Sequence, residues 1–240
     1  MFGLAGAVAF FITQYSLAYF ILFRKYRKPE RWEAASCTIS MAHGPLVTVL
    51  AAYDIAVSKW QLDAPNTGLE RAVMEYSIAY FMVDLFHYLL FVPGKLLFVA
   101  HHLATAFVMA SCRFYAGHGA QALMALLCVA EITSACQNTW SLSMFAMHVE
   151  PTRARRIHEA VCVPFYVLYS VARGIVAPLL AWRLSCFYLG GRADGVMPRW
   201  LVQCWMGIVV LAILASVLWV VDLWVEFFRA CRKKNSVKVC

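Results

Sequence analysis

Two adjacent histidines, His101 and His102, lie inside an apolar segment, and acidic side chains occupy the apolar segments on either side of it. Asp84 and His87 fall in the preceding segment, and Glu131 falls in the following one. A buried imidazole beside a carboxylate can act as a general base or bind a polar group, because its charge changes near neutral pH. These five residues are therefore the first candidates for a functional site.

The composition places these residues in a membrane. Of the 240 residues, 62% are apolar and 14% are charged, whereas about 25% are charged in soluble domains, and the mean hydropathy is +0.67. A helix that crosses the hydrocarbon core needs about 20 residues. Seven segments meet that length, at residues 1–23, 34–58, 72–92, 96–116, 120–147, 159–184 and 200–228. Since strands cannot satisfy their backbone in lipid unless they close a barrel, we predict an all-α polytopic membrane protein with about seven transmembrane helices.

Five of these segments carry one polar face each at helical spacing. The polar residues are Ser36, Ser40, His43 and Asp54; Ser77, Tyr80, Asp84, His87 and Tyr88; His101, His102 and Thr105; Glu131, Ser134, Asn138 and Ser141; and Cys162, Tyr166, Tyr169, Ser170 and Arg173. A charged group at bilayer depth costs about 2.5–3.5 kcal/mol, so such groups face the protein interior. We therefore predict a ring of helices around a polar-lined cavity.

The candidate residues divide by role. If the protein is an enzyme, His101, His102 and Asp84 are the catalytic candidates, with Asp84 orienting an imidazole. The residues expected to contact a lipid are His87, Glu131, Ser134, Asn138 and Arg173. Glu131 and Arg173 both fall near mid-membrane, so we also expect a direct ion pair between them, which could be purely structural. Ser134 and Asn138 can equally serve as hydrogen bonds between helices, and His43, beside Gly44 and Pro45, reads as a packing residue.

The basic residues predict the topology. Lys and Arg concentrate at 24–31, 95, 153–156 and 229–238. Because successive loops lie on alternating sides of the membrane, these four segments fall on the same side. The positive-inside rule then puts the N-terminus in the lumen and the C-terminus in the cytosol. The domains expected are a first helix with its basic cytosolic loop at 1–33, a six-helix domain at 34–228 and a basic cytosolic tail at 229–240. The net charge of +8 thus reflects topology, and no nucleic-acid partner is expected.

The nine cysteines show no CxxC or metal-ligand spacing, and the histidines form no HxxxH or HxxHH cluster, so no metal and no cofactor is predicted. Cys112 and Cys186 both fall near lumenal ends of their spans and could form a disulfide. Cys231 and Cys240 follow the last span and could be palmitoylated.

Three stretches of the chain carry a family resemblance: residues 80–87 (YFMVDLFH), 98–105 (FVAHHLAT) and 131–138 (EITSACQN). In combination they resemble the signature of the TLC-domain family, which includes the ceramide synthases. The resemblance implies a helical bundle around a lipid-sized tunnel, a place in endomembranes and most often in the endoplasmic reticulum. Membrane lipids, and acyl-CoA as a possible substrate, are the partners that it implies.

The chain departs from the ceramide synthases at one motif. Those enzymes join a fatty acyl-CoA to a sphingoid amine, and their motif has a further histidine and acidic residues here. In this chain Ala130 stands where that histidine would be, Glu131 matches the first acidic position and Ser134 the later one. The pattern instead resembles a branch written Glu-Leu-Ser-Thr/Ser-Pro, with Ala135 in place of the proline. The resemblance thus favours a branch other than the ceramide synthases.

Two functions stand open at this point. The first is a protein of membrane-lipid homeostasis that binds or regulates a lipid or acyl chain. The second is an acyl-CoA-dependent acyltransferase that uses His101 or His102 as base or nucleophile. A transporter is weaker, because no pair of broken helices is evident in the sequence.

Overall fold

The structure is a computed structural model that describes residues 3–237, with side chains described to residue 229 and at Arg232. Its helices, several of which continue through a π-helical turn (η), are α1 (Leu4–Leu17), η1 (Ala18–Leu22), α2 (Lys28–Val57), α3 (Gly68–Phe91), α4 (Leu96–Ser111), η2 (Cys112–Ala116), α5 (Ala120–Glu131), α6 (Ser134–Ala146), α7 (Pro151–Val171), η3 (Ala172–Val176), α8 (Ala177–Leu189) and α9 (Arg199–Val237). Cys240 lies outside the described residues, and the side chain of Cys231 is not described either, so palmitoylation at both stays a prediction.

The predicted all-α membrane fold is confirmed. Within the described residues 3–237, six helical segments are long and apolar enough to cross a membrane: α1–η1, α2, α4–η2, α5–α6, α7–α8 and α9. The remaining helix, α3, has 24 residues and so reaches about 36 Å. It is less apolar because it carries Glu70, Arg71, Glu75 and Asp84. Together these segments form the seven spans expected from the sequence.

Several helices extend beyond the predicted apolar segments, and the fifth and sixth spans differ most in form. The fifth span, predicted as one helix over 120–147, is divided, because α5 ends at Glu131 and α6 begins at Ser134. The sixth, predicted over 159–184, runs from Pro151 to Leu189. Its first turns are rich in arginine and therefore fall outside an apolar window, but Pro151 stands at the start of the helix, where proline is well tolerated.

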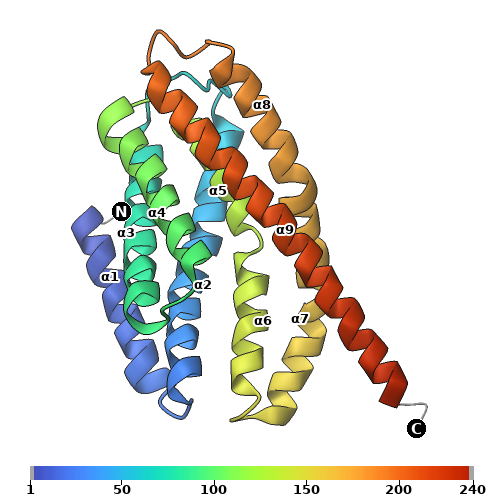
Figure 1. Cartoon of the computed structure of the whole chain (residues 1–240). Helices are drawn as coiled ribbons and strands as arrows, with labels where there is room; N and C mark the ends of the chain where they lie inside the picture. Colours follow the sequence, from blue (N-terminus) through green and yellow to red (C-terminus); the bar gives the residue numbers. More distant parts are fainter. Residues whose placement is uncertain (1–2, 238–240) are drawn as a thin grey trace.

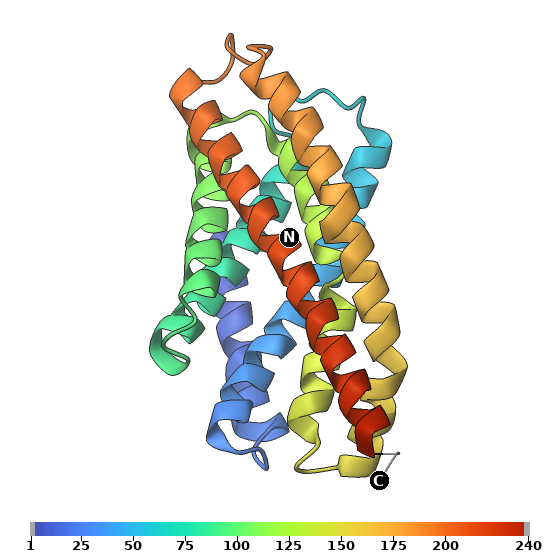
Figure 2. The same ribbon diagram turned by 45° about the vertical axis from the view of Figure 1, so that its right-hand side comes forward.

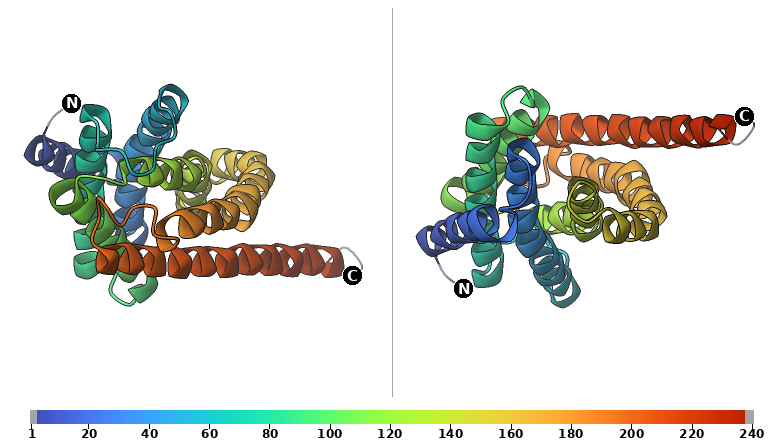
Figure 3. Two further views of the ribbon diagram at one scale, coloured as in Figure 1. Left: turned by 90° about the horizontal axis from the view of Figure 1, so that it is seen from above. Right: turned by 90° about the horizontal axis from the view of Figure 1, so that it is seen from below.

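The helices form an upright bundle in which α2 contacts α1, α3, α5 and α6 (Figure 1). The α1–α2 loop, the α6–α7 loop and the C-terminal end of α9 lie at the same end of the bundle (Figure 2). The short turn between α3 and α4 also faces that way (Figure 1). The four basic segments of the sequence are therefore gathered toward one end, here called the basic end. Helix α9 runs obliquely along one side of the bundle (Figure 3).

At the opposite end, side chains fasten the loops. Thr67 and Glu70 cap α3 reciprocally: the Glu70 amide donates to Thr67 Oγ1 at 3.2 Å and the Thr67 amide donates to Glu70 Oε2 at 2.5 Å. Cys112 and Cys186 are both free thiols, with Cys112 buried and Cys186 exposed. The Cys112 thiol donates to the carbonyl of His118 at 3.2 Å. The suggested disulfide is therefore absent from the structure.

Candidate functional site

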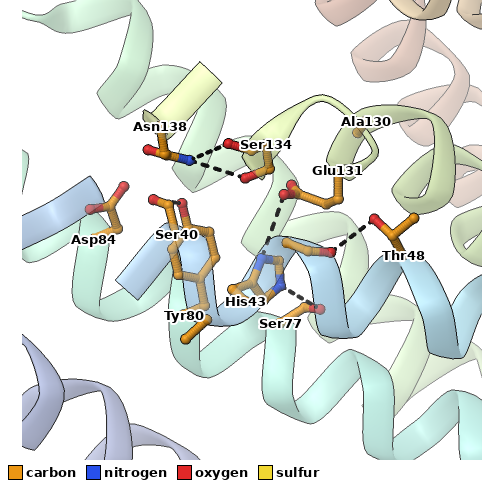
Figure 4. A network of polar contacts seen from close by, with 12 residues as sticks. Ser40, His43, Thr48, Ser77, Tyr80, Asp84, Ala130, Glu131, Ser134 and Asn138 are labelled. Carbon is orange, nitrogen blue, oxygen red and sulfur yellow. Dashed lines mark hydrogen bonds and ion pairs between the residues drawn. The ribbon is translucent and has the colours of Figure 1, made fainter. Parts of the chain in front are cut away.

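The site is built where α2 crosses the junction between α5 and α6. A Cβ atom placed on Gly44 would lie 2.5 Å from Ser134 Cβ and 2.9 Å from Glu131 Oε2, so only glycine fits at this crossing. Ala135 replaces the proline of the Glu-Leu-Ser-Thr/Ser-Pro pattern, yet the helix is still interrupted at Ile132 and Thr133. The interruption brings Glu131 and Ser134 to face α2 (Figure 4).

Asp84 and His102 form a buried pair; the sequence alone leaves open which of the two histidines Asp84 meets. His102 Nε2 lies 2.8 Å from Asp84 Oδ2, and Asp84 Oδ1 accepts a hydrogen bond from Ser36 at 2.6 Å. His102 Nδ1 lies 2.8 Å from the carbonyl oxygen of Phe98. Both ring nitrogens thus lie within 3 Å of a protein oxygen, although the short contact of Nε2 with Asp84 does not have hydrogen-bond geometry. His102 is therefore placed against Asp84, with both nitrogens buried inside the protein.

His43 belongs to the same network, although the sequence reading made it a packing residue. Its side chain is fully buried, and its ring stacks on Tyr80 at 4.1 Å between centroids. His43 Nε2 contacts Ser77 Oγ at 3.0 Å, and Nδ1 lies 3.8 Å from Glu131 Oε2 (Figure 4). The signal was present in the sequence, because His43 lies on the polar face of its helix with Ser36 and Ser40.

The predicted ion pair between Glu131 and Arg173 is not formed. The Glu131 carboxylate turns toward His43 instead. Arg173 Nη2 donates to the carbonyl oxygen of Ala130 at 3.0 Å, and the guanidinium lies 5.7 Å from the centroid of the Tyr169 ring. The correction has a geometric cause. The chain breaks between α5 and α6 directly after Glu131 and directs its carboxylate to α2, while η3 presents Arg173 to the backbone of α5.

His101 differs from its neighbour His102. Its ring makes no hydrogen bond to another described residue, and its contacts are edge-to-face with Phe81 at 6.3 Å and His102 at 5.6 Å. The imidazole lines three adjoining hollows of the protein. Of the two histidines, His101 alone has free ring nitrogens that a bound molecule could reach.

The first hollow, here called the polar cavity, has a volume of about 370 Å³ and extends toward the basic end, where Glu33 and Lys95 line it. Its polar lining is supplied by Glu33, Ser36, Ser40, Asp84, Lys95, His101, His102, Glu131, Ser134, Gln137, Asn138, Ser141 and Arg173. Lys95 and Glu33 form an ion pair across its outer part. The sequence reading missed Glu33, because it precedes the predicted apolar segment.

The second hollow, the apolar cavity, has about 120 Å³ and lies farther from the basic end, between α4, α5, η3 and α9. Phe81, His101, Ala130, Glu131 and Arg173 line both it and the polar cavity, so these residues mark the boundary. The third hollow, of about 210 Å³, is a groove between α4 and α9 lined largely by alanine and leucine. It is called the lateral groove below.

Of the remaining predicted residues, two line the polar cavity and one lies away from it. Asn138 donates to the carbonyl oxygen of Ser134 at 2.8 Å and to Ser134 Oγ at 3.2 Å, and both side chains line the polar cavity. His87 is buried away from the three hollows, and its Nδ1 lies 2.9 Å from the Tyr15 hydroxyl. His87 is therefore not brought together with the other candidates.

Comparison with known proteins agrees with the resemblance seen in the sequence. The family model described as the TLC domain matches residues 32–225. A TLC domain-containing protein of Arabidopsis thaliana is 42% identical over 231 residues, which cover 95% of this chain and 91% of the relative. No solved structure gives a significant match.

Proposed function

The chain belongs to the TLC-domain family, and on that premise we propose that it acts in membrane-lipid homeostasis by binding a lipid or acyl chain in its central cavities. The observation that carries the proposal is the meeting of a polar and an apolar cavity at His101 and Arg173. An amphiphile fits that division, with its headgroup in the polar cavity and its chain in the apolar one. Membrane lipids are therefore the proposed partners. We further propose that the protein resides in the endoplasmic reticulum, with its N-terminus in the lumen and its C-terminus in the cytosol.

The volumes indicate how such a lipid would lie. Sites for small molecules usually measure about 300–1,000 Å³. The polar cavity, at about 370 Å³, is within that range, and the apolar cavity, at about 120 Å³, is below it. A long acyl chain therefore has to continue elsewhere. The lateral groove between α4 and α9 also touches His101 and offers the continuation into the membrane.

Obstruction of the lateral groove tests the proposal. Ala104 and Ala212 line the groove from opposite helices. Ala212→Trp should reduce the lipid that copurifies with the protein, as measured by native mass spectrometry, because an indole fills the space between α4 and α9. Ala5→Trp is the matched control, since Ala5 is exposed on α1 and lines none of the hollows described here. Equal lipid occupancy in Ala212→Trp and the wild type would contradict the route, and absence of copurified lipid from the wild type would contradict the proposal itself.

Acyl transfer is the second candidate, and it rests on one specific observation. His101 has free ring nitrogens in the cavity, while the buried pair of Asp84 and His102 lies beside it, with 5.6 Å between the two imidazole centroids. A base or nucleophile at this place would be His101, with His102 in a supporting role. An assay with acyl-CoA and an amine tests it. Product formed by the wild type and lost in His101→Gln would support transferase activity, and absence of product from folded wild type would leave lipid binding alone.

A further inference from the structure

Arg173 has fewer partners than a guanidinium in a membrane requires. The group carries five N–H donors, and its hydrogen bond in the structure runs from Nη2 to the carbonyl oxygen of Ala130 at 3.0 Å. Its Nε is buried without a hydrogen-bond partner. No described carboxylate lies within ion-pair distance of it. A charge held this way at bilayer depth is costly, so the cavity is built to be completed by an acceptor.

The other charged groups of the polar cavity are already engaged. Glu33 pairs with Lys95, Asp84 with His102 at 2.8 Å, and Glu131 is directed to His43 at 3.8 Å. Each carboxylate among the described lining residues thus has its own cationic or imidazole neighbour. Arg173 is the charged lining residue whose strongest contact is a backbone carbonyl.

The local backbone fixes this orientation. Arg173 lies in the π-helical turn η3, which interrupts the regular helix between α7 and α8. Such turns are rare and occur frequently at functional sites, because they re-aim a side chain. Here the turn places Arg173 in the wall shared by the polar and the apolar cavity. Gly174 next to it meets only Val220 near the 4 Å limit.

From these observations we infer that the ligand is an anionic amphiphile whose oxyanion is bound by Arg173. This inference rests on the proposed lipid-binding function and adds the chemistry of the headgroup. The planar guanidinium matches two oxygens of a carboxylate or a phosphate. Its position at the boundary requires the apolar chain to begin directly beside the oxyanion, as in a fatty acid or an anionic phospholipid.

Glu131 bounds the same space and sets a limit on the binding mode. Its carboxylate lines both cavities and would repel an oxyanion placed next to it. Because Gly44 leaves room for the carboxylate to approach α2, Glu131 turns toward His43 and forms no ion pair with Arg173. The oxyanion therefore binds on the side of Arg173 that faces His101.

Native mass spectrometry with defined probes tests the inference. Purified protein is titrated with oleate and with oleyl alcohol, which has the same chain, and separately with phosphatidic acid and phosphatidylcholine of matched chains. We expect at least one anionic probe to bind about tenfold more tightly than its uncharged or zwitterionic counterpart, because a charge-assisted bidentate contact is lost in the counterpart. Preference for oleate identifies a carboxylate ligand, and preference for phosphatidic acid identifies a phosphate ligand.

Variants locate the preference. Arg173→Gln should bring the ratio of the affinities for the anionic probe and its counterpart close to one. Arg173→Lys should retain part of the preference, because lysine keeps the positive charge but cannot make the bidentate contact of a guanidinium. Arg183→Gln, at an exposed position of α8, should leave it unchanged. Equal binding of charged and uncharged probes by the wild type would overturn the inference while leaving lipid binding intact, and so would a full preference in Arg173→Gln. Binding of no probe would mean that the proposed function itself fails. The wild-type comparison decides the matter even if a variant does not fold.

Discussion

Two groups of polar side chains beside the central cavities differ in burial and in the number of contacts that they make with the rest of the protein. The closed cluster on α2, α3 and α4 consists of Ser36, His43, Ser77, Asp84 and His102, and each of these side chains is at most 5% exposed. Asp84 contacts Ser36 and His102, and His43 contacts Ser77. By contrast, the open wall consists of His101 on α4 and Arg173 in η3, whose ring nitrogens and guanidinium line the hollows with few protein partners. In a membrane interior, a satisfied polar group holds helices together. An unsatisfied one indicates a place for a ligand.

The largest effect is expected from breaking the closed cluster. Asp84→Ala removes the carboxylate that faces His102 and leaves an uncompensated charge buried among the helices. Such a loss destabilises a protein by about 3–5 kcal/mol. The midpoint of thermal unfolding in detergent should fall sharply. Asp222→Ala, at an exposed position of α9, is the control and should change the midpoint little; equal effects of the two substitutions would show that Asp84 is not held as described.

A smaller loss of stability is expected at the crossing of α2 and α6. Gly44→Ala places a methyl group 2.5 Å from Ser134 Cβ, and overpacking of this kind costs about 1–3 kcal/mol. Gly207→Ala is the matched control, because nothing lies within 4 Å of a Cβ there. Since alanine favours a helix over glycine by up to about 1 kcal/mol, Gly207→Ala should stabilise slightly. The same sign for both changes in unfolding experiments would refute the close approach of α2 to α6.

The smallest effect on stability is expected in the open wall. His101→Gln removes no hydrogen bond between described residues, so the free energy of unfolding should fall by about 1 kcal/mol or less, well below the loss expected for Asp84→Ala. The lipid that copurifies with the protein should change in amount or kind, because His101 lines all three hollows. His102→Gln should show the reverse order, with stability lost first. If both substitutions have the same profile, the distinction between the two histidines is wrong.

The sequence predicts the helices of this fold well and the contacts of the site less well. Apolar length alone locates the spans, because a bilayer imposes it. The closeness of Asp84 to the double histidine also follows from helical spacing and the short turn between α3 and α4, but the choice of His102 over His101 does not. The partner of Glu131 does not follow from the sequence. It depends on the helix interruption at 132–133, where the sequence has no proline, and on Gly44, whose role is evident only once α2 and α6 are seen in contact. Depth in the membrane can be counted along a helix, but the direction in which a side chain turns cannot.

The polarity of α3 has a consequence for how the chain enters the membrane. This helix carries Glu70, Arg71 and Glu75 in its first turns and Asp84 farther along, and a charged residue opposes insertion by up to about 2.5–3.5 kcal/mol, most strongly near the middle of a span. Yet α3 ends at Phe91 and α4 begins at Leu96, so the two helices can enter the bilayer together as a hairpin. During synthesis, α3 is then expected to wait at the translocon until α4 emerges. A nascent chain that stops before residue 96 should leave α3 outside the bilayer, whereas one that includes Ala116 should insert both.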